Sequence, residues 1–334
     1  MLYKILIFVI ISLVIYFGIA AGLIFSDHPQ ALLESTNESL SFDALTAINY
    51  TEIPELQPYT ARDGATLYYR RYVSDTPTDN VLILLHGSGW HSMQFYPLAN
   101  YLSNHGVTNV ITPDLRGHGF NPERRGDLDY IGQFEDDLAD LIEMLREQYP
   151  ASVVVIGGHS SGGGLVVRFA GSKYKSMSDA YILLAPFLKY NAPTTRPNSG
   201  GWAHPLSRRI AGLTMVNNLG IHAFDDLTVI QFAMPNSIME SALGESATTA
   251  YSQRLNTSFS PRSNYERDLA AIQVPFLLAA GLEDEAFIAK AYEPTISAQT
   301  DTGTYILLPD LGHIGLLTDQ ALFDVTSSWL SNLH

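Results

Sequence analysis

Residues 152–170 read SVVVIGGHSSGGGLVVRFA and carry the strongest signal for the fold. Residues 152–157 are a continuous apolar and β-branched run, which predicts a strand covered on both sides. Residues 165–170 are again mostly apolar and predict a helix. A Gly-x-Ser-x-Gly pattern lies between them at residues 158–162. A strand, a sharp turn and a helix in this order would lift Ser160 clear of the sheet, where its hydroxyl could act as a nucleophile.

The glycines of this pattern have a steric explanation. A turn that carries Ser160 is tight and strained, and a side chain at Gly158 or Gly162 would collide with the neighbouring strand or helix. We therefore expect both glycines to support the loop that presents Ser160. The alternative is a glycine-rich turn between a strand and a helix that has no catalytic role.

Short β-branched runs alternate with helical patterns on both sides of this stretch, which predicts an α/β fold with a mostly parallel central sheet and helices on both faces. In residues 134–145, apolar side chains recur at helical spacing, and Glu135, Asp136, Asp140 and Glu143 are expected on the solvated side. The predicted strands are residues 66–73, 81–85, 107–113, 152–157, 180–184, 276–280 and 303–308.

A serine nucleophile needs a base, and His313 is the candidate. A serine hydroxyl reacts slowly at neutral pH unless a nearby imidazole accepts its proton. Of the histidines after Ser160, His313 alone follows a predicted core strand, at residues 303–308, on a short loop that could reach back over the turn. This order, serine before acid before histidine, is the one that the strand–turn–helix pattern requires.

The base in turn needs a carboxylate that orients it, and Asp284 is the first choice. The predicted strand at residues 276–280 ends in Gly-Leu-Glu-Asp-Glu at residues 281–285. A carboxylate at the carboxyl end of this strand lies in the correct chain order between Ser160 and His313. Glu283 and Glu285 remain alternatives, because the sequence does not show which side chain points inward.

A negatively charged tetrahedral intermediate also needs backbone N–H donors. The glycine-rich turn His86-Gly87-Ser88-Gly89 follows the predicted strand at residues 81–85. We expect the amides of Ser88 and Ser161 to form the oxyanion hole, and His86 and Gly87 to support this loop. A plain β-turn is the alternative.

These motifs resemble the α/β-hydrolase superfamily, and within it the branch of monoacylglycerol lipases and lysophospholipases. The resemblance implies ester hydrolysis by a Ser160, Asp284 and His313 triad, with no metal and no organic cofactor. The chain departs from the branch at Ser161, where an apolar residue is common, and at Phe120-Asn121, where a serine is common. The matching segments are HGSGWHS at 86–92, DLRGHG at 114–119, GHSSG at 158–162, GLED at 281–284 and GH at 312–313.

The expected hydrolase core comprises residues 60–187 and 273–334, and residues 188–272 form a helical cap or lid inserted between its strands. This segment is too long for a loop in a compact domain. Its many apolar residues could line a pocket for an acyl chain, or they could form the small core of the cap itself. A cap of this kind would select the substrate.

The N-terminus differs from the rest of the chain. Residues 5–25 are almost entirely apolar, long enough to cross a membrane as a helix, so residues 1–27 are predicted to be an anchor. Lys4 precedes this run and acidic residues follow it, which favours a cytoplasmic N-terminus and a catalytic domain on the extracytoplasmic side. A cleaved signal peptide, which would yield a secreted protein, is the alternative. Residues 28–59 are polar and are predicted to be a linker.

Composition excludes several functions. The 334 residues include 19 Lys and Arg against 34 Asp and Glu, and a net charge of −15 disfavours binding to nucleic acid. The chain has no cysteine, which excludes thiolate nucleophiles and disulfides. The sequence shows no sign of an obligatory protein partner. The predicted substrate is a small lipid-like ester, such as a monoacylglycerol or lysophospholipid; acyl transfer, amide or thioester hydrolysis, and a non-catalytic anchored binding module are the alternatives.

Overall fold

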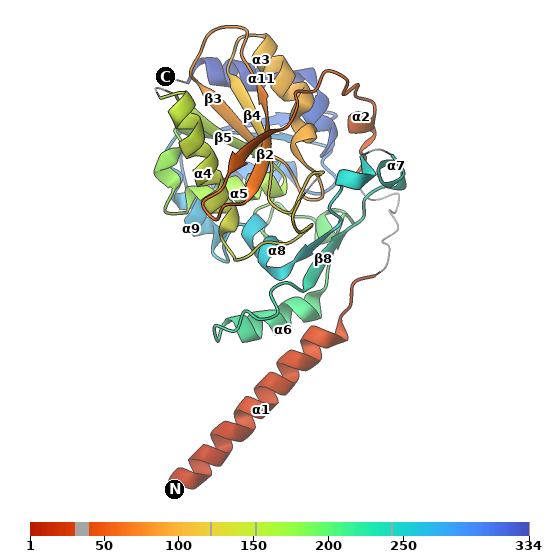
Figure 1. The fold of residues 1–334 in the computed structure, drawn as a ribbon, viewed down its shortest axis with the longest axis vertical. Helices are drawn as coiled ribbons and strands as arrows, with labels where there is room; N and C mark the ends of the chain where they lie inside the picture. Colours follow the sequence, from red (N-terminus) through yellow and green to blue (C-terminus); the bar gives the residue numbers. More distant parts are fainter. Residues whose placement is uncertain (31–39, 121, 151, 242, 334) are drawn as a thin grey trace.

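The computed structural model describes residues 1–30, 40–120, 122–150, 152–241 and 243–333, and an eight-stranded sheet forms its centre (Figure 1). The strand order is β1-β2-β4-β3-β5-β6-β10-β11. All neighbours from β4 to β11 are parallel, whereas β2 is antiparallel to β1 and β4, so the mostly parallel sheet is confirmed. The strands are β1 (Gln57–Thr60), β2 (Thr66–Tyr72), β3 (Val81–Leu85), β4 (Asn109–Asp114), β5 (Val154–His159), β6 (Ala180–Leu184), β10 (Phe276–Gly281) and β11 (Gly303–Leu308).

Helices cover both faces of this sheet (Figure 1). Helices α3 and α11 contact each other, and α5 packs with α4 and α9. The strands between these helices are buried along their whole length, as the continuous apolar runs predict. The helices of this part of the chain are α3 (Tyr96–Asn104), α4 (Gln133–Gln148), α5 (Ser161–Ala170), α9 (Tyr265–Ala270), α10 (Tyr292–Ile296) and α11 (Gln320–Ser331).

The strand boundaries agree closely with the sequence patterns, with two differences that matter for the site. β5 extends two residues beyond the predicted end, so that His159 is its last residue and Ser160 follows at once. β1 was not predicted, because its sequence, QPYT, is short, contains a proline and lacks an apolar run. Antiparallel backbone pairing with β2 places it at the edge of the sheet, and of its side chains Tyr59 is buried in the core.

Helix α4 corrects the expected solvated position of Glu135. This side chain is buried, and its Oε1 accepts hydrogen bonds from Arg168 Nε at 2.7 Å and Arg262 Nη2 at 3.1 Å. Burial raises the pKa of Glu135, and the two guanidinium groups oppose that rise. The helical pattern could not predict this site, because the two arginines come from distant parts of the chain.

The insertion between β6 and β10 is present, but it is not purely helical as expected. It contains an antiparallel sheet of β7 (Ala203–Pro205), β8 (Thr228–Phe232) and β9 (Ala250–Ser252). Its last helices, α8 and α9, pack against α5 of the core. The insertion is therefore a mixed cap that joins the core along α5. The helices of the insertion before α9 are α6 (Ser207–Asn217), α7 (Asn236–Met239) and α8 (Gln253–Phe259).

The segment predicted to be a linker, residues 28–59, also needs correction in its second half. Leu40, Phe42 and Leu45, beside the short helix α2 (Asp43–Thr46), are buried in the main hydrophobic core. The Phe42 ring lies 5.4 Å from the ring of Trp90 and 5.4 Å from that of Trp202. Three apolar residues in a polar segment gave no periodic signal, but their burial attaches the segment to the body. Residues 31–39 of the predicted linker lie outside the described residues.

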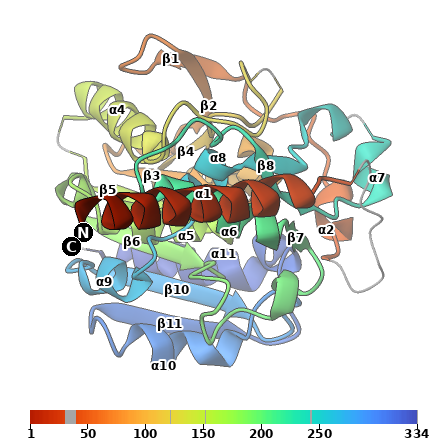
Figure 2. The same ribbon diagram turned by 90° about the horizontal axis from the view of Figure 1, so that it is seen from below.

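Helix α1 (Leu2–Ser26) has 25 residues and is long and apolar enough to cross a membrane. Its most apolar part has a mean hydropathy of 2.7, and only 6% of that part is buried. A core helix of a soluble protein would be mostly buried, which this helix is not. The C-terminal part of α1 lies against α6 of the cap (Figures 1 and 2).

Candidate active site

Ser160 occupies a strained turn between β5 and α5. Its backbone has φ 55° and ψ −120°, in a region that residues with a side chain rarely adopt. The Ser160 N–H donates to Leu184 O at 3.0 Å, and Ser160 O accepts from Phe187 N at 2.8 Å. A Cβ at Gly158 would collide with Gly162 in α5, and one at Gly162 would collide with Leu85 O at the end of β3. These close approaches hold the turn in place.

The loops after β10 and β11 bring Asp284 and His313 together. His313 Nδ1 and Asp284 Oδ2 are 2.8 Å apart, and each residue is only 1% exposed. Asp284 Oδ1 accepts from the backbone N–H groups of Ala286 and Phe287, both at 2.8 Å. A carboxylate accepts a hydrogen bond from the Nδ1–H group, which leaves the lone pair of Nε2 available as a base.

The two rival carboxylates have different positions. Glu283 is exposed. Glu285 Oε2 accepts a hydrogen bond from the backbone N–H of His313 at 2.7 Å, so it holds the main chain rather than the ring. Asp284 is thus the carboxylate that contacts the imidazole, and Glu285 fixes the loop that carries it.

His159, which directly precedes Ser160 in the chain, packs against His313 and so places the two candidate residues near each other. The His159 and His313 rings lie 4.3 Å apart, and His159 Nε2 donates to His313 O at 3.1 Å. Within the described part of the chain, no hydrogen bond joins Ser160 Oγ to His313. Catalytic hydrogen bonds often tighten only when substrate binds, so the candidate role of His313 as the base rests on its bond to Asp284 and its packing against His159.

The loop after β3 lies directly over the turn at Ser160. Ser88 Oγ and Ser161 Oγ form a hydrogen bond of 3.1 Å, and a Cβ at Gly87 would stand 3.3 Å from Ser160 Cβ. Among the described residues, neither the Ser88 nor the Ser161 backbone N–H has an acceptor. Two free amides beside a candidate nucleophile are the donors that an oxyanion needs.

His86 supports this loop from below. Its Nδ1 donates to Gly87 O at 2.9 Å, and its Nε2 accepts from Leu115 N at 3.2 Å. Burial lowers the pKa of His86 to about 4, so the ring is neutral at pH 7 and can donate from one nitrogen and accept at the other.

Sequence reasoning missed a buried chain of hydrogen bonds that links the three loops. Gly87 N donates to Gln94 Oε1 at 2.7 Å, and Gln94 Nε2 donates to His159 Nδ1 at 2.7 Å. His159 Nε2 then donates to His313 O. Burial, followed by the proximity of His313, lowers the pKa of His159 well below its usual value, which keeps this ring neutral. His159 precedes Ser160 in the chain, where the serine–acid–histidine order does not place a base, and no sequence signal marks Gln94.

Replacement of Gln94 by methionine is expected to lower kcat about 10-fold with little change in KM, because the oxyanion loop and the base would lose their common connection. Steady-state kinetics on a soluble ester, at a temperature well below unfolding, would measure the effect. Gln148→Met on the exposed side of α4 is the control and should leave kcat unchanged. An unchanged kcat in the Gln94 variant would show that the chain of hydrogen bonds does not position the site.

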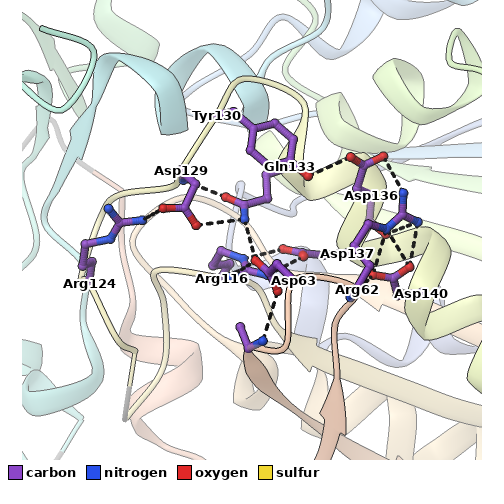
Figure 3. A network of polar contacts seen from close by, with 11 residues as sticks. Arg62, Asp63, Arg116, Arg124, Asp129, Tyr130, Gln133, Asp136, Asp137 and Asp140 are labelled. Atoms are coloured by element: carbon purple, nitrogen blue, oxygen red, sulfur yellow. Dashed lines mark hydrogen bonds and ion pairs between the residues drawn. The ribbon is translucent and has the colours of Figure 1, made fainter. Parts of the chain in front are cut away.

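The cap also contacts this site through Tyr251. Gly89 N donates to Tyr251 Oη at 2.7 Å, and Tyr251 Oη in turn donates to His118 Nε2 at 2.7 Å. His118 belongs to the DLRGHG loop, whose Arg116 forms a two-point ion pair with Asp137 at 2.7 and 2.9 Å (Figure 3). Arg116 also pairs with Asp63 at 3.0 Å. The charged network of Figure 3 therefore fixes the loop on which the cap rests.

No metal site accompanies this arrangement in the described ranges of the chain, where no group of three or more His, Asp or Glu side chains is placed to hold an ion. The chemistry available here is that of a serine, an imidazole and a carboxylate, with two backbone amides beside them.

The chain is similar in sequence and in fold to several known proteins. Human monoglyceride lipase is 26% identical over 242 residues, which cover 71% of this chain and 75% of that protein. Lipase 3 of Moraxella sp. is 24% identical over 82% of this chain and 83% of its own length. A soluble variant of Saccharomyces cerevisiae monoglyceride lipase, solved with a substrate analogue, has the same fold, with a TM-score of 0.63, 20% identity and coverage of 84% and 96%. The family model described as serine aminopeptidase, S33, matches residues 76–319, so the chain belongs to this hydrolase family, in the α/β-hydrolase branch that resembles monoacylglycerol lipases.

Proposed function

We propose that this protein is a membrane-anchored serine hydrolase that cleaves carboxylic esters of lipid-like substrates, such as a monoacylglycerol or a lysophospholipid. The observation that carries the proposal is the buried hydrogen bond between Asp284 and His313 beside the strained turn of Ser160. It supports the proposal because acyl transfer to serine requires a base near the nucleophile and a carboxylate that orients the base.

The proposed reaction has two halves. His313 Nε2 accepts the proton of Ser160, Oγ attacks the ester carbonyl, and the amides of Ser88 and Ser161 donate to the resulting oxyanion. The tetrahedral intermediate collapses, and the alcohol leaves with the proton held by His313. Water then attacks the acyl-enzyme with His313 again as the base, which releases the carboxylic acid and restores Ser160. Asp284 keeps the Nδ1 proton in place throughout.

The cap supports a lipid-like substrate. Met234 Cε lies 3.0 Å, and the Trp202 ring 3.3 Å, from the position of a Cβ at Gly89, and Trp202 Nε1 lies 3.5 Å from Ser88 Oγ. Apolar side chains therefore cover the oxyanion loop, as expected for a site that receives an acyl chain. Helix α1 would anchor this site to the bilayer in which such lipids reside, with Lys4 on the cytoplasmic side and the catalytic domain on the other.

One observation favours a second activity. The matched family is described as a serine aminopeptidase, so the same triad could hydrolyse amides. Amides are poorer acyl donors than esters because the amine leaves less readily, and a preference for one class would be visible in direct comparison.

The test compares ester, thioester and amide substrates that share one acyl chain, using the full chain reconstituted in lipid vesicles. We expect the ester to be hydrolysed fastest, and chain lengths typical of lipids to have the highest kcat/KM. Labelling by a fluorophosphonate, followed by peptide mapping, should place the label on Ser160. Faster turnover of the amide, formation of a new ester when glycerol is added, or a label elsewhere would contradict ester hydrolysis.

A further inference from the structure

We propose that helix α1 is a retained, structural part of the cap, and that it holds cap helix α6 in the interfacial layer of the membrane. This inference rests on the proposed anchoring and goes beyond it. In addition to attaching the chain to the membrane, α1 would pack against the cap as part of its structure. The views of Figures 1 and 2 both place the C-terminal part of α1 along α6.

The first support is a close apolar contact between the two helices. Ala20 and Ile24 of α1 are only 1% and 2% exposed, and they form a separate hydrophobic cluster with Leu213, Val216 and Val229 of the cap. A Cβ at Gly212 would stand 2.7 Å from Ala20 O and 2.8 Å from Ile24 Cγ1, so the helix backbones approach as closely as glycine permits. Small residues that allow such an approach are typical of helix pairs within membranes.

Hydrogen bonds lock the same contact. Tyr16 Oη donates to Met215 O at 2.8 Å, and the Arg208 N–H donates to Asp27 Oδ2 at 3.1 Å. Arg209, which is 5% exposed, donates from Nε to Ile24 O at 3.1 Å and from Nη1 to Thr228 O at 2.8 Å. Arg209 therefore satisfies a carbonyl in the last turn of α1, where no backbone partner is available.

The contacts show that α1 and α6 pack in antiparallel directions. They also determine how far from the membrane surface α6 can lie. Residues 2–15 of α1 are exposed throughout, and they extend about 21 Å at 1.5 Å per residue. The hydrocarbon layer is about 30 Å thick. If α1 crosses it, the segment from Tyr16 onward must complete the span, and α6, which packs on that segment, is drawn to the membrane surface.

Exposed apolar side chains lie where this placement requires them. Phe25 of α1 and Leu219, just after α6, are each 53% exposed, and Phe224 is 39% exposed. The Phe25 and Phe224 rings are in edge contact at 6.1 Å, so these side chains continue the apolar surface of α1 onto the cap. In the proposed placement the bilayer covers these side chains, because they adjoin a helix that is long and apolar enough to span it.

The contact also argues against removal of α1 as a signal peptide. Cleavage in the region of Gly18–Gly22 would separate the apolar run from the cap, expose Leu213 and Val216, and leave buried Arg209 without a firmly held acceptor at Ile24. Trp202 and Tyr251 of the cap contact the oxyanion loop. A cap fixed at the membrane would therefore hold these side chains, and the site that they cover, close to a lipid substrate.

The chain contains no cysteine, which allows the depth of α6 to be measured with single labels. Leu219→Cys and Asn104→Cys would each carry an environment-sensitive fluorophore in phosphatidylcholine vesicles; α3, which ends at Asn104, lies on the far side of the core from α1 (Figure 1). We expect lipid-borne nitroxides to quench the label at 219 and not the label at 104. Mass spectrometry of the protein extracted from membranes should find residues 1–27 still attached.

Matched substitutions in α1 then test the helix contact without changing the catalytic body. Ala20→Leu should force α1 from α6 and reduce quenching at position 219 to the level seen at 104. Gly22→Leu is the control, because a Cβ at Gly22 meets nothing within 4 Å, and it should leave quenching unchanged. Gly212→Leu should repeat the Ala20 result from the cap side.

An unquenched label at 219 in the otherwise wild-type chain, equal quenching in the Ala20→Leu and Gly22→Leu variants, or absence of residues 1–27 from the mature protein would each overturn the inference. None of these measurements requires turnover. Hydrolysis of a soluble short-chain ester by the same samples therefore tests the proposed activity separately from the proposed placement of the cap.

Discussion

Ser160→Ala is expected to lower kcat for ester hydrolysis by roughly 10⁴- to 10⁶-fold, as loss of the nucleophile does in other serine hydrolases. The variant retains the oxyanion amides and the substrate contacts, so KM should change far less than kcat. The substitution removes one hydroxyl group at a turn held by backbone hydrogen bonds to Leu184 and Phe187, so the fold should persist.

The measurement is a pre-steady-state assay with an activated ester, in which wild type should release one equivalent of alcohol in a burst and Ser160→Ala none. Ser161→Ala is the matched neighbour. Its side chain bonds only to Ser88 Oγ in the described contacts, and its amide is retained, so it should lose less than about 10-fold. Retention of the burst and of fluorophosphonate labelling in Ser160→Ala would remove the basis of the proposed mechanism.

Asp284→Asn is the second large effect, with an expected fall in kcat of about 10⁴-fold. Asparagine has the same shape, and its Oδ1 can still accept from Ala286 and Phe287. Its amide group would then face His313 Nδ1 with a donor. The imidazole would be held with its proton on Nε2, and that nitrogen could no longer accept the proton of Ser160.

The neighbouring carboxylates provide the contrast. Glu285→Gln keeps an oxygen that can accept from the His313 backbone N–H, and Glu283→Gln changes an exposed side chain. Each of these two substitutions should leave kcat within about 10-fold of wild type. Circular dichroism should show that all three variants remain folded. A larger loss of kcat in Glu285→Gln than in Asp284→Asn would show that Glu285, and not Asp284, orients the imidazole.

Local patterns in the sequence predicted the parts of the fold that depend on neighbouring residues. The strand–turn–helix around Ser160 and the bounds of β6 and β11 follow from runs of apolar residues and glycines close together in the chain. β1 escaped prediction because its pairing with β2 involves backbone groups, which leave no mark on the pattern. The burial of Phe42 escaped for a related reason: one aromatic residue in a polar segment has no period.

The candidate site divides in the same way. Ser160 and His313 follow from motif and chain order, whereas the choice of Asp284 over Glu283 and Glu285 needed the direction of each side chain. Gln94 could not be recognised at all, since its partners Gly87 and His159 lie at different distances along the chain and meet only when β3 and β5 pair.

The sequence by itself determined which residues can do chemistry and in what order they occur, because apolar periodicity, glycine positions and the chain order of serine, acid and histidine are local or linear properties. Only the tertiary structure decided which carboxylate contacts His313, how Gln94 joins the loops, and that α1 packs against the cap. Those outcomes depend on side chains and helix faces from distant segments meeting in space, and the close contacts of Gly212 with Ala20 and Ile24 have no trace in either segment read alone.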